Sequence, residues 1–72
     1  MPVQQIFAGP TGADLREERL AADIKGFEVA IQMRVHSSRV SQIEALAQVP
    51  ADSAERYRVA LAAAIAAKGA AA

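Results

Sequence analysis

A short run of hydrogen-bonding side chains between residues 37 and 42 has the residue types best suited to recognising a ligand. The amide of Gln42 can donate to and accept from adenine at the same time, and the guanidinium of Arg39 suits guanine or phosphate. The hydroxyls of Ser37 and Ser38 reach less far, and they serve equally well to cap the start of a helix. The run, which also contains Ser41, therefore has side chains that can form hydrogen bonds to a polar ligand.

The residue types that catalysis needs are missing or scattered. The chain has no cysteine and a single histidine, His36, so a thiolate metal site is excluded and a zinc site is not expected. No nucleophile has a base at suitable spacing, and no glycine-rich phosphate loop is present. We therefore expect no enzyme, no cofactor and no metal. His36 is expected to cap a helix or to lie on the surface.

Four helices are expected to position the polar run. The hydroxyl of Thr11 and the acid of Asp14 are typical of a capping signal. The first helix is expected to follow this signal and to continue to about Ala22, with Leu15 and Leu20 facing inward. An interruption over residues 23–26 separates it from a second, short helix with four apolar positions: Phe27, Ala30, Ile31 and Met33.

The third and fourth helices follow a break at residues 34–36 and a stop at Pro50. The third is expected from Arg39 to about Leu46, and one of its faces carries Val40, Ile43 and Ala47. A second capping signal, Asp52 to Glu55, opens a fourth helix that is expected to reach about Ala67. Its apolar stripe, for the core or a dimer face, is Tyr57, Leu61 and Ile65. Lys68 and Gly69 are typical of a helix C-terminus.

Two short helices joined by a three-residue turn, the second beginning with small polar residues, have the geometry of a DNA-binding helix-turn-helix. In such a unit the first helix crosses the phosphate backbone. The second helix lies in the major groove with its N-terminal side chains at the base edges. The side chains expected to hold the two helices together are Ala30, Val35, Val40 and Ile43.

The residues from Lys25 to Glu44 resemble the helix-turn-helix of the lambda-repressor/Cro-like (XRE) family of transcriptional regulators. Residues 38–44, SRVSQIE, look like the recognition helix of that family, and residues 28–30, EVA, are similar to its preceding helix. Residues 15–20 resemble its first helix. Pro50, residues 55–57 and residues 60–61 look like the segment after the recognition helix. The resemblance covers about residues 13–66.

The resemblance implies base contacts from Ser37, Ser38 and Gln42, and a structural role for Glu44 through bonds within the domain. This chain has Arg34 where the family often has glycine in the turn, and Gly26 where it often has a phosphate-binding glutamine. Phosphate contacts are then expected from Lys25, Arg34 and a backbone N–H near Gly26. The complete set of candidate DNA-binding residues is Lys25, Gly26, Arg34, His36, Ser37, Ser38, Arg39, Ser41 and Gln42.

With 72 residues, many of them alanine, the chain is one domain near the lower size limit, and dimerisation would help its small core. We expect an all-α, compact, lambda-repressor-like bundle of four or five helices over residues 13–68. An extended arm is expected over 1–12 and a tail over 69–72. Eight basic and eight acidic residues give zero net charge, which argues mildly against nucleic acid, although residues 25–43 are locally basic.

These observations predict a regulator of bacterial or phage origin, a repressor by preference, that binds a palindromic operator in double-stranded DNA as a homodimer. No apolar run approaches the ~18 residues that span a bilayer, so a cytoplasmic protein without membrane contact is expected. The alternative is a helical assembly subunit with the same fold that binds protein rather than DNA. A third alternative is a regulator whose module binds another protein, such as RNA polymerase.

Overall fold

Helix α1 (Gly12–Ala21) begins at the predicted capping signal. The Oγ1 atom of Thr11 accepts a hydrogen bond from the backbone N of Asp14 at 3.0 Å, and Oδ2 of Asp14 accepts one from the backbone N of Thr11 at 3.0 Å. Both bonds satisfy backbone donors that the first turn of a helix leaves free. The expected capping box is therefore confirmed.

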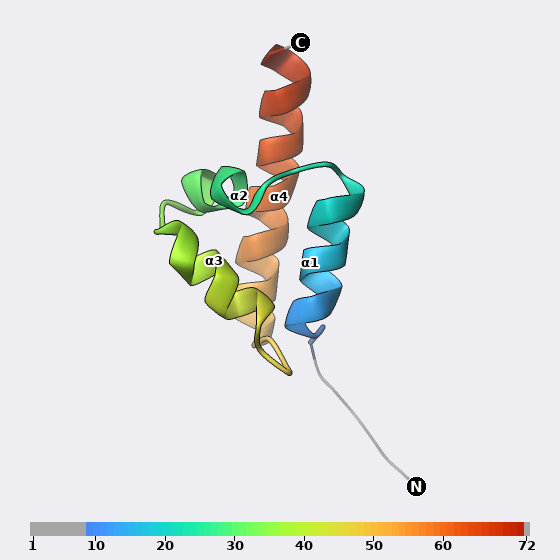
Figure 1. Ribbon diagram of the computed structural model, residues 1–72, viewed down its shortest axis with the longest axis vertical. Helices are drawn as coiled ribbons and strands as arrows, with labels where there is room; N and C mark the ends of the chain where they lie inside the picture. Colours follow the sequence, from blue (N-terminus) through green and yellow to red (C-terminus); the bar gives the residue numbers. More distant parts are fainter. Residues whose placement is uncertain (1–8, 72) are drawn as a thin grey trace, which may run out of the picture.

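The computed structural model describes residues 9–71, so most of the arm expected over residues 1–12 lies outside the described residues. Three helices follow α1, namely α2 (Gly26–Met33), α3 (Ser37–Glu44) and α4 (Ala51–Ala71). No strand occurs between residues 9 and 71, and the expected all-α fold is confirmed with four helices. Helices α1 and α2 pack on α4, and α3 packs on α1 and α2 (Figure 1).

Helices α1 and α2 end in the same way, with a non-glycine residue in the left-handed conformation. Asp23 has φ 59° and Arg34 has φ 61°. The backbone N of the next residue, Ile24 or Val35, donates to a carbonyl five residues earlier at 3.1 Å. This is the Schellman arrangement, in which the chain turns sharply and a hydrophobic residue folds back over the helix end. Ile24 is buried and Val35 packs against the core.

The bounds of α3 and α4 differ from the expected ones. Helix α3 begins two residues before Arg39 and ends at Glu44, so Ala47 lies beyond it and is exposed. Helix α4 begins one residue before Asp52 and continues past the expected end at Ala67 through Gly69, which was expected to stop it. A glycine inside a helix costs only about 1 kcal/mol relative to alanine, and its neighbours, Lys68 and several alanines, are strong helix formers.

The core contains one side of each helix. Its buried members are Leu15, Ile24, Val29, Ala30, Val40, Ile43, Val49, Ala54, Tyr57, Ala60, Leu61 and Ala64. The stripe expected on α4 is thus confirmed for Tyr57 and Leu61. No helix among the described residues is both long and apolar enough to cross a membrane.

Leu20, which is expected to face inward, is instead 51% exposed. Three other large apolar side chains, Phe27, Ile31 and Ile65, are 45–65% exposed. On α1, Arg19 takes the inward position beside Leu20 because its guanidinium is bonded to Glu44. On α2, Val29 and Ala30 face the other helices, which leaves Phe27 and Ile31 on the uncovered side. Ile65 lies on α4 off the side that Tyr57, Leu61 and Ala64 bury.

Gly12 allows the start of α1 to lie directly on the end of α3. A Cβ atom at this position would lie 2.4 Å from the carbonyl oxygen of Glu44 and 2.5 Å from that of Ile43. The backbone N of Gly12 also donates to the carbonyl oxygen of Leu46 at 2.9 Å. Because these neighbours are backbone atoms, no side-chain rotation can relieve the overlap.

We expect Gly12→Ala to lower the free energy of unfolding by about 1–3 kcal/mol, since an overpacked contact forces the backbone to shift. Gly69→Ala is the matched control, because nothing lies within 4 Å of a Cβ added there. That change should instead raise the free energy of unfolding by about 0.5–1 kcal/mol. Urea denaturation of the two variants measures both values, and a destabilised Gly69→Ala or an unaffected Gly12→Ala would contradict this packing.

Candidate nucleic-acid interface

Helices α2 and α3 form a helix-turn-helix unit. Each helix has eight residues, and only residues 34–36 connect them. The turn depends on the left-handed conformation of Arg34, as expected for a position that the resembled family often fills with glycine. The side chain of Arg34 is exposed, whereas Val35 points back to the core.

His36 is the N-cap of α3. Its Nδ1 atom accepts a hydrogen bond from the backbone N of Ser38 at 3.2 Å and lies 2.9 Å from Oγ of Ser38. The capping role expected for His36 is therefore confirmed. Neither Ser37 nor Ser38 is the N-cap residue. The alternative in which one of these serines caps α3 is therefore wrong.

The outward side of α3 carries the predicted polar run. All five of its members are exposed, and they are Ser37, Ser38, Arg39, Ser41 and Gln42. The opposite side holds Val40 and Ile43, which are at most 3% exposed. No other helix covers the outer side of α3 in Figure 1. A long contact of 3.5 Å joins Nη1 of Arg39 to Oε1 of Gln42, so the two side chains lie next to each other on this surface.

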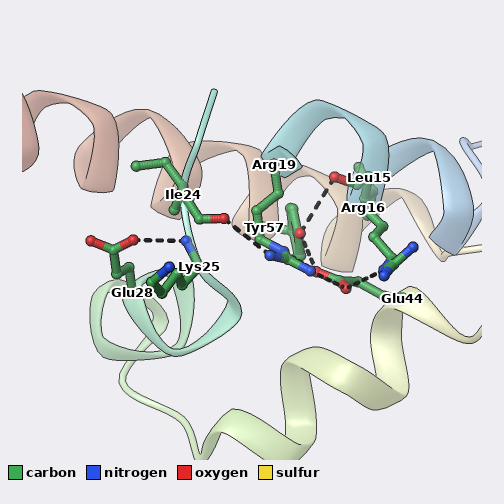
Figure 2. A network of polar contacts seen from close by, with 8 residues as sticks. All are labelled: Leu15, Arg16, Arg19, Ile24, Lys25, Glu28, Glu44 and Tyr57. Carbon is green, nitrogen blue, oxygen red and sulfur yellow. Dashed lines mark hydrogen bonds and ion pairs between the residues drawn. The ribbon is translucent and has the colours of Figure 1, made fainter. Parts of the chain in front are cut away.

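The N-terminus of α2 lies beside α3. A Cβ added to Gly26 would come within 3.9 Å of Cγ1 of Val40, which places this end of α2 against the middle of α3. Lys25 precedes it as the N-cap residue and is exposed. Its backbone N donates to Oε1 of Glu28 at 2.7 Å (Figure 2), so this particular N–H is already bonded within the protein.

Among the described residues, four of the five cations away from the helix-turn-helix unit form ion pairs, and the fifth, Arg56 on α4, does not. Arg16 and Arg19 pair with Glu44, Arg58 pairs with Glu18, and Lys68 pairs with Asp23. Within residues 9–71, Lys25, Arg34 and Arg39 take part in no ion pair. The positive charge near α3 is thus available to a ligand although the net charge of the chain is zero. The described residues also contain no group of three or more His, Cys, Asp or Glu placed to hold a metal.

A network around Glu44 fixes the C-terminal end of α3 (Figure 2). Nε and Nη2 of Arg19 donate to the two carboxylate oxygens at 2.8 and 3.0 Å, and the hydroxyl of Tyr57 donates to Oε2. The Tyr57 hydroxyl is also 3.4 Å from the carbonyl oxygen of Leu15. Nη1 of Arg19 donates to the carbonyl oxygen of Ile24 at 3.0 Å.

This network joins α3 to α1, α4 and the connection before α2, and the Glu44 side chain is only 8% exposed. The structural role expected for Glu44 is confirmed. Its partners were not predicted from the sequence, because Arg19 lies 25 residues earlier and no local spacing connects the two. The position of Tyr57 on the expected apolar stripe was the available signal in the sequence, since a buried tyrosine hydroxyl requires a hydrogen-bond partner.

Burial and hydrogen bonding act in opposite directions on the pKa of Glu44. Burial alone raises it, but the hydrogen bonds from Arg19 and Tyr57, with the charges of Arg19 and Arg16, together hold the pKa below its ordinary value. For Tyr57, burial and the bond to Glu44 raise the pKa of the phenol, so it remains a donor. Glu44 is therefore ionised in the folded protein at neutral pH.

The chain matches no protein-family model, no curated protein and no solved structure. What the structure defines is a small all-helical protein with a helix-turn-helix unit and a polar, locally cationic surface on α3.

The lowered pKa of Glu44 leads to a prediction for acid stability. A carboxyl group whose pKa is lower in the folded than in the unfolded chain stabilises the fold at pH values above 4.5, its pKa in the unfolded chain. This contribution is lost as the pH falls through the pKa of the folded state. We expect Glu44→Gln to lower the free energy of unfolding by about 2 kcal/mol at neutral pH. Below about pH 5, the free energy of unfolding of this variant should also depend less on pH than that of the unchanged chain.

Denaturation with urea between acid and neutral pH measures this effect. The matched control is Glu17→Gln, which removes the same charge from an exposed side chain on α1. It should change the free energy of unfolding by no more than about 0.5 kcal/mol and retain the acid dependence. Parallel curves for Glu44→Gln and the unchanged chain would refute the role given to the carboxylate.

Proposed function

We propose that this chain is a sequence-specific DNA-binding transcriptional regulator of the lambda-repressor/Cro-like class, and that it inserts α3 into the major groove. The observation that carries the proposal is the exposed polar run on α3, which contains Arg39 and has Lys25 and Arg34 near it. These three cations have no ion-pair partner among the described residues. Phosphate contacts fix the position of such a protein on the duplex, and base contacts provide the specificity.

Each candidate residue has a role in this arrangement. Gln42 pairs with adenine through its amide, and Arg39 contacts phosphate or guanine. Lys25, the N-terminus of α2 at Gly26, and Arg34 contact the phosphate backbone. Ser37, Ser38 and Ser41 contribute short hydrogen bonds, and His36 holds the first turn of α3 in place through its bond to Ser38.

Considerations of affinity favour a homodimer that binds a palindromic site, with one copy of the chain on each half-site. One such module makes few phosphate contacts, so its non-specific dissociation constant is of the order of 10⁻⁴–10⁻⁶ M at physiological salt. Two half-sites about one helical turn apart add the affinity and specificity that one copy lacks. Repression by occupying a promoter in a bacterial or phage genome is the simplest mechanism, because it requires only that the module binds its site.

The competing proposal is a helical assembly subunit that binds protein. It is favoured by the zero net charge and by the exposure of Phe27, Ile31 and Val59. This protein would self-associate and would show no salt-dependent binding to DNA. Binding to duplex DNA therefore discriminates between the two functions.

We expect binding of the chain to duplex DNA to weaken steeply with salt, because neutralising each phosphate releases counterions. Arg39→Ala should reduce the slope of log K against log salt concentration by about 0.9, the value for one phosphate contact. Arg58→Ala is the control, since it removes the same charge from a residue already paired with Glu18. The proposal fails if binding is independent of salt or if both variants change the slope equally.

Selection from a random duplex pool tests sequence recognition in the same protein. An enriched palindrome is expected. Gln42→Ala should then lose about 1–3 kcal/mol of preference at one adenine in each half-site while its salt dependence remains unchanged. Recovery of no preferred sequence would contradict base readout by α3.

A further inference from the structure

One uncovered surface of the molecule combines projecting apolar side chains with adjoining hollows. We call it the α2–α4 face, and it consists of Phe27, Ile31, Gln32, Met33, Val59 and Ala63. Phe27, Ile31 and Val59 are 54%, 65% and 63% exposed. Large apolar groups gathered on one surface of a soluble domain mark a site of association.

Two hollows lie side by side on this face. The first, of about 420 Å³, lies between Met33 on α2 and Val59 and Ala63 on α4. The second, of about 320 Å³, has Phe27 and Ile31 along its edge. Gln32 lines both hollows, which places it near the centre of the face.

The face has both projecting apolar side chains and hollows that can receive them. A two-fold axis near Gln32 would place Phe27 and Ile31 of one copy over the first hollow of the other copy, and the reverse. An interface with two-fold symmetry requires this property, because both copies present the same surface. Aromatic and aliphatic groups that fill a partner's hollow supply most of the binding energy in such interfaces.

Both ends of the face carry charges of both signs. Asp52, Glu55 and Arg56 line the first hollow, which has an excess of one negative charge, and Lys68 and Glu28 line the second. Reversal by a two-fold axis brings Glu55 toward Lys68 of the second copy and Arg56 toward Glu28 of the second copy. Lys68 already donates to the carbonyl oxygen of Asp23, while its side chain remains 48% exposed.

We propose that the α2–α4 face is a homodimer interface whose occupant is a second copy of this chain. The stretch of α4 from Asp52 to Lys68 is about 24 Å long, and two helices are about 20 Å wide. That footprint of about 480 Å² is smaller than the roughly 800 Å² per partner of a standard interface, so a weak dimer is expected. The further step, that this dimer places one copy on each DNA half-site, rests on the proposed function.

The test uses sedimentation equilibrium of the full chain without DNA, so the failure of this proposal and of DNA binding can be told apart. The unchanged chain should dimerise at micromolar to millimolar concentration. Ile31→Glu should raise the dissociation constant by about tenfold or more, because it buries an unpaired charge in the interface. Leu20→Glu is the matched control and should leave the dissociation constant unchanged.

The control matches closely, because Leu20 is 51% exposed and its carbonyl accepts the same type of turn bond, from Asp23, that the Ile31 carbonyl accepts from Arg34. A second pair of variants covers the case in which Ile31→Glu loses helical structure. Glu55→Lys alone should weaken the dimer by repelling Lys68 of the second copy. Glu55→Lys combined with Lys68→Glu should restore it.

Two outcomes would overturn the proposal. A chain that remains monomeric to millimolar concentration would show that a second copy does not occupy the face. A dimer weakened by Leu20→Glu as much as by Ile31→Glu, with no rescue in the charge-exchanged double variant, would place the contact elsewhere on the molecule.

Discussion

The carboxylate of Glu44, held by Arg19 and Tyr57, is the contact on which the orientation of α3 depends. An isolated helix of eight residues is not stable in water, because nucleation is costly and each added residue contributes little. Helix α3 therefore depends on tertiary contacts. Val40 and Ile43 supply the apolar ones, and the Glu44 network connects its last turn to α1 and α4.

The two ends of α3 have different roles in this arrangement. The C-terminal end is bonded inside the protein through Glu44, whereas the N-terminal end is capped by His36 and presents its polar side chains to solvent. Elsewhere among the described residues, Arg16, Arg19, Arg58 and Lys68 are paired with acids and only Arg56 is not, whereas none of the three cations around the helix-turn-helix unit is paired. A chain of zero net charge can therefore have a locally positive surface, which is what the proposed DNA contact requires.

Local signals in the sequence predicted the parts of the fold that depend on neighbouring residues. The Thr11 cap and the short turn are of this kind, whereas the special backbone position at Arg34 was indicated only by the resemblance to a family that often has glycine there. Periodicity was less informative about which side of a helix is buried. On α1 the inward position next to Leu20 belongs to Arg19, because a partner 25 residues away binds its guanidinium.

The candidate site could be predicted in part for the same reason. The exposure of the polar run and the capping role of His36 follow from local spacing on α3. The exposed apolar side of α2 could not be predicted, because Val29 rather than Ile31 faces the neighbouring helices and only the packing of α2 on α4 decides this. The extension of α4 to Ala71 depends on a difference of about 1 kcal/mol at Gly69.

Stability and charge act against each other at position 34. An arginine in the left-handed conformation costs about 1–2 kcal/mol that a glycine would not, yet its side chain is one of the unpaired cations beside α3. Glycine at this position would relax the turn and at the same time remove that cation. A selection for heat-resistant variants alone would therefore tend to enrich proteins with a less positive surface at the start of α3.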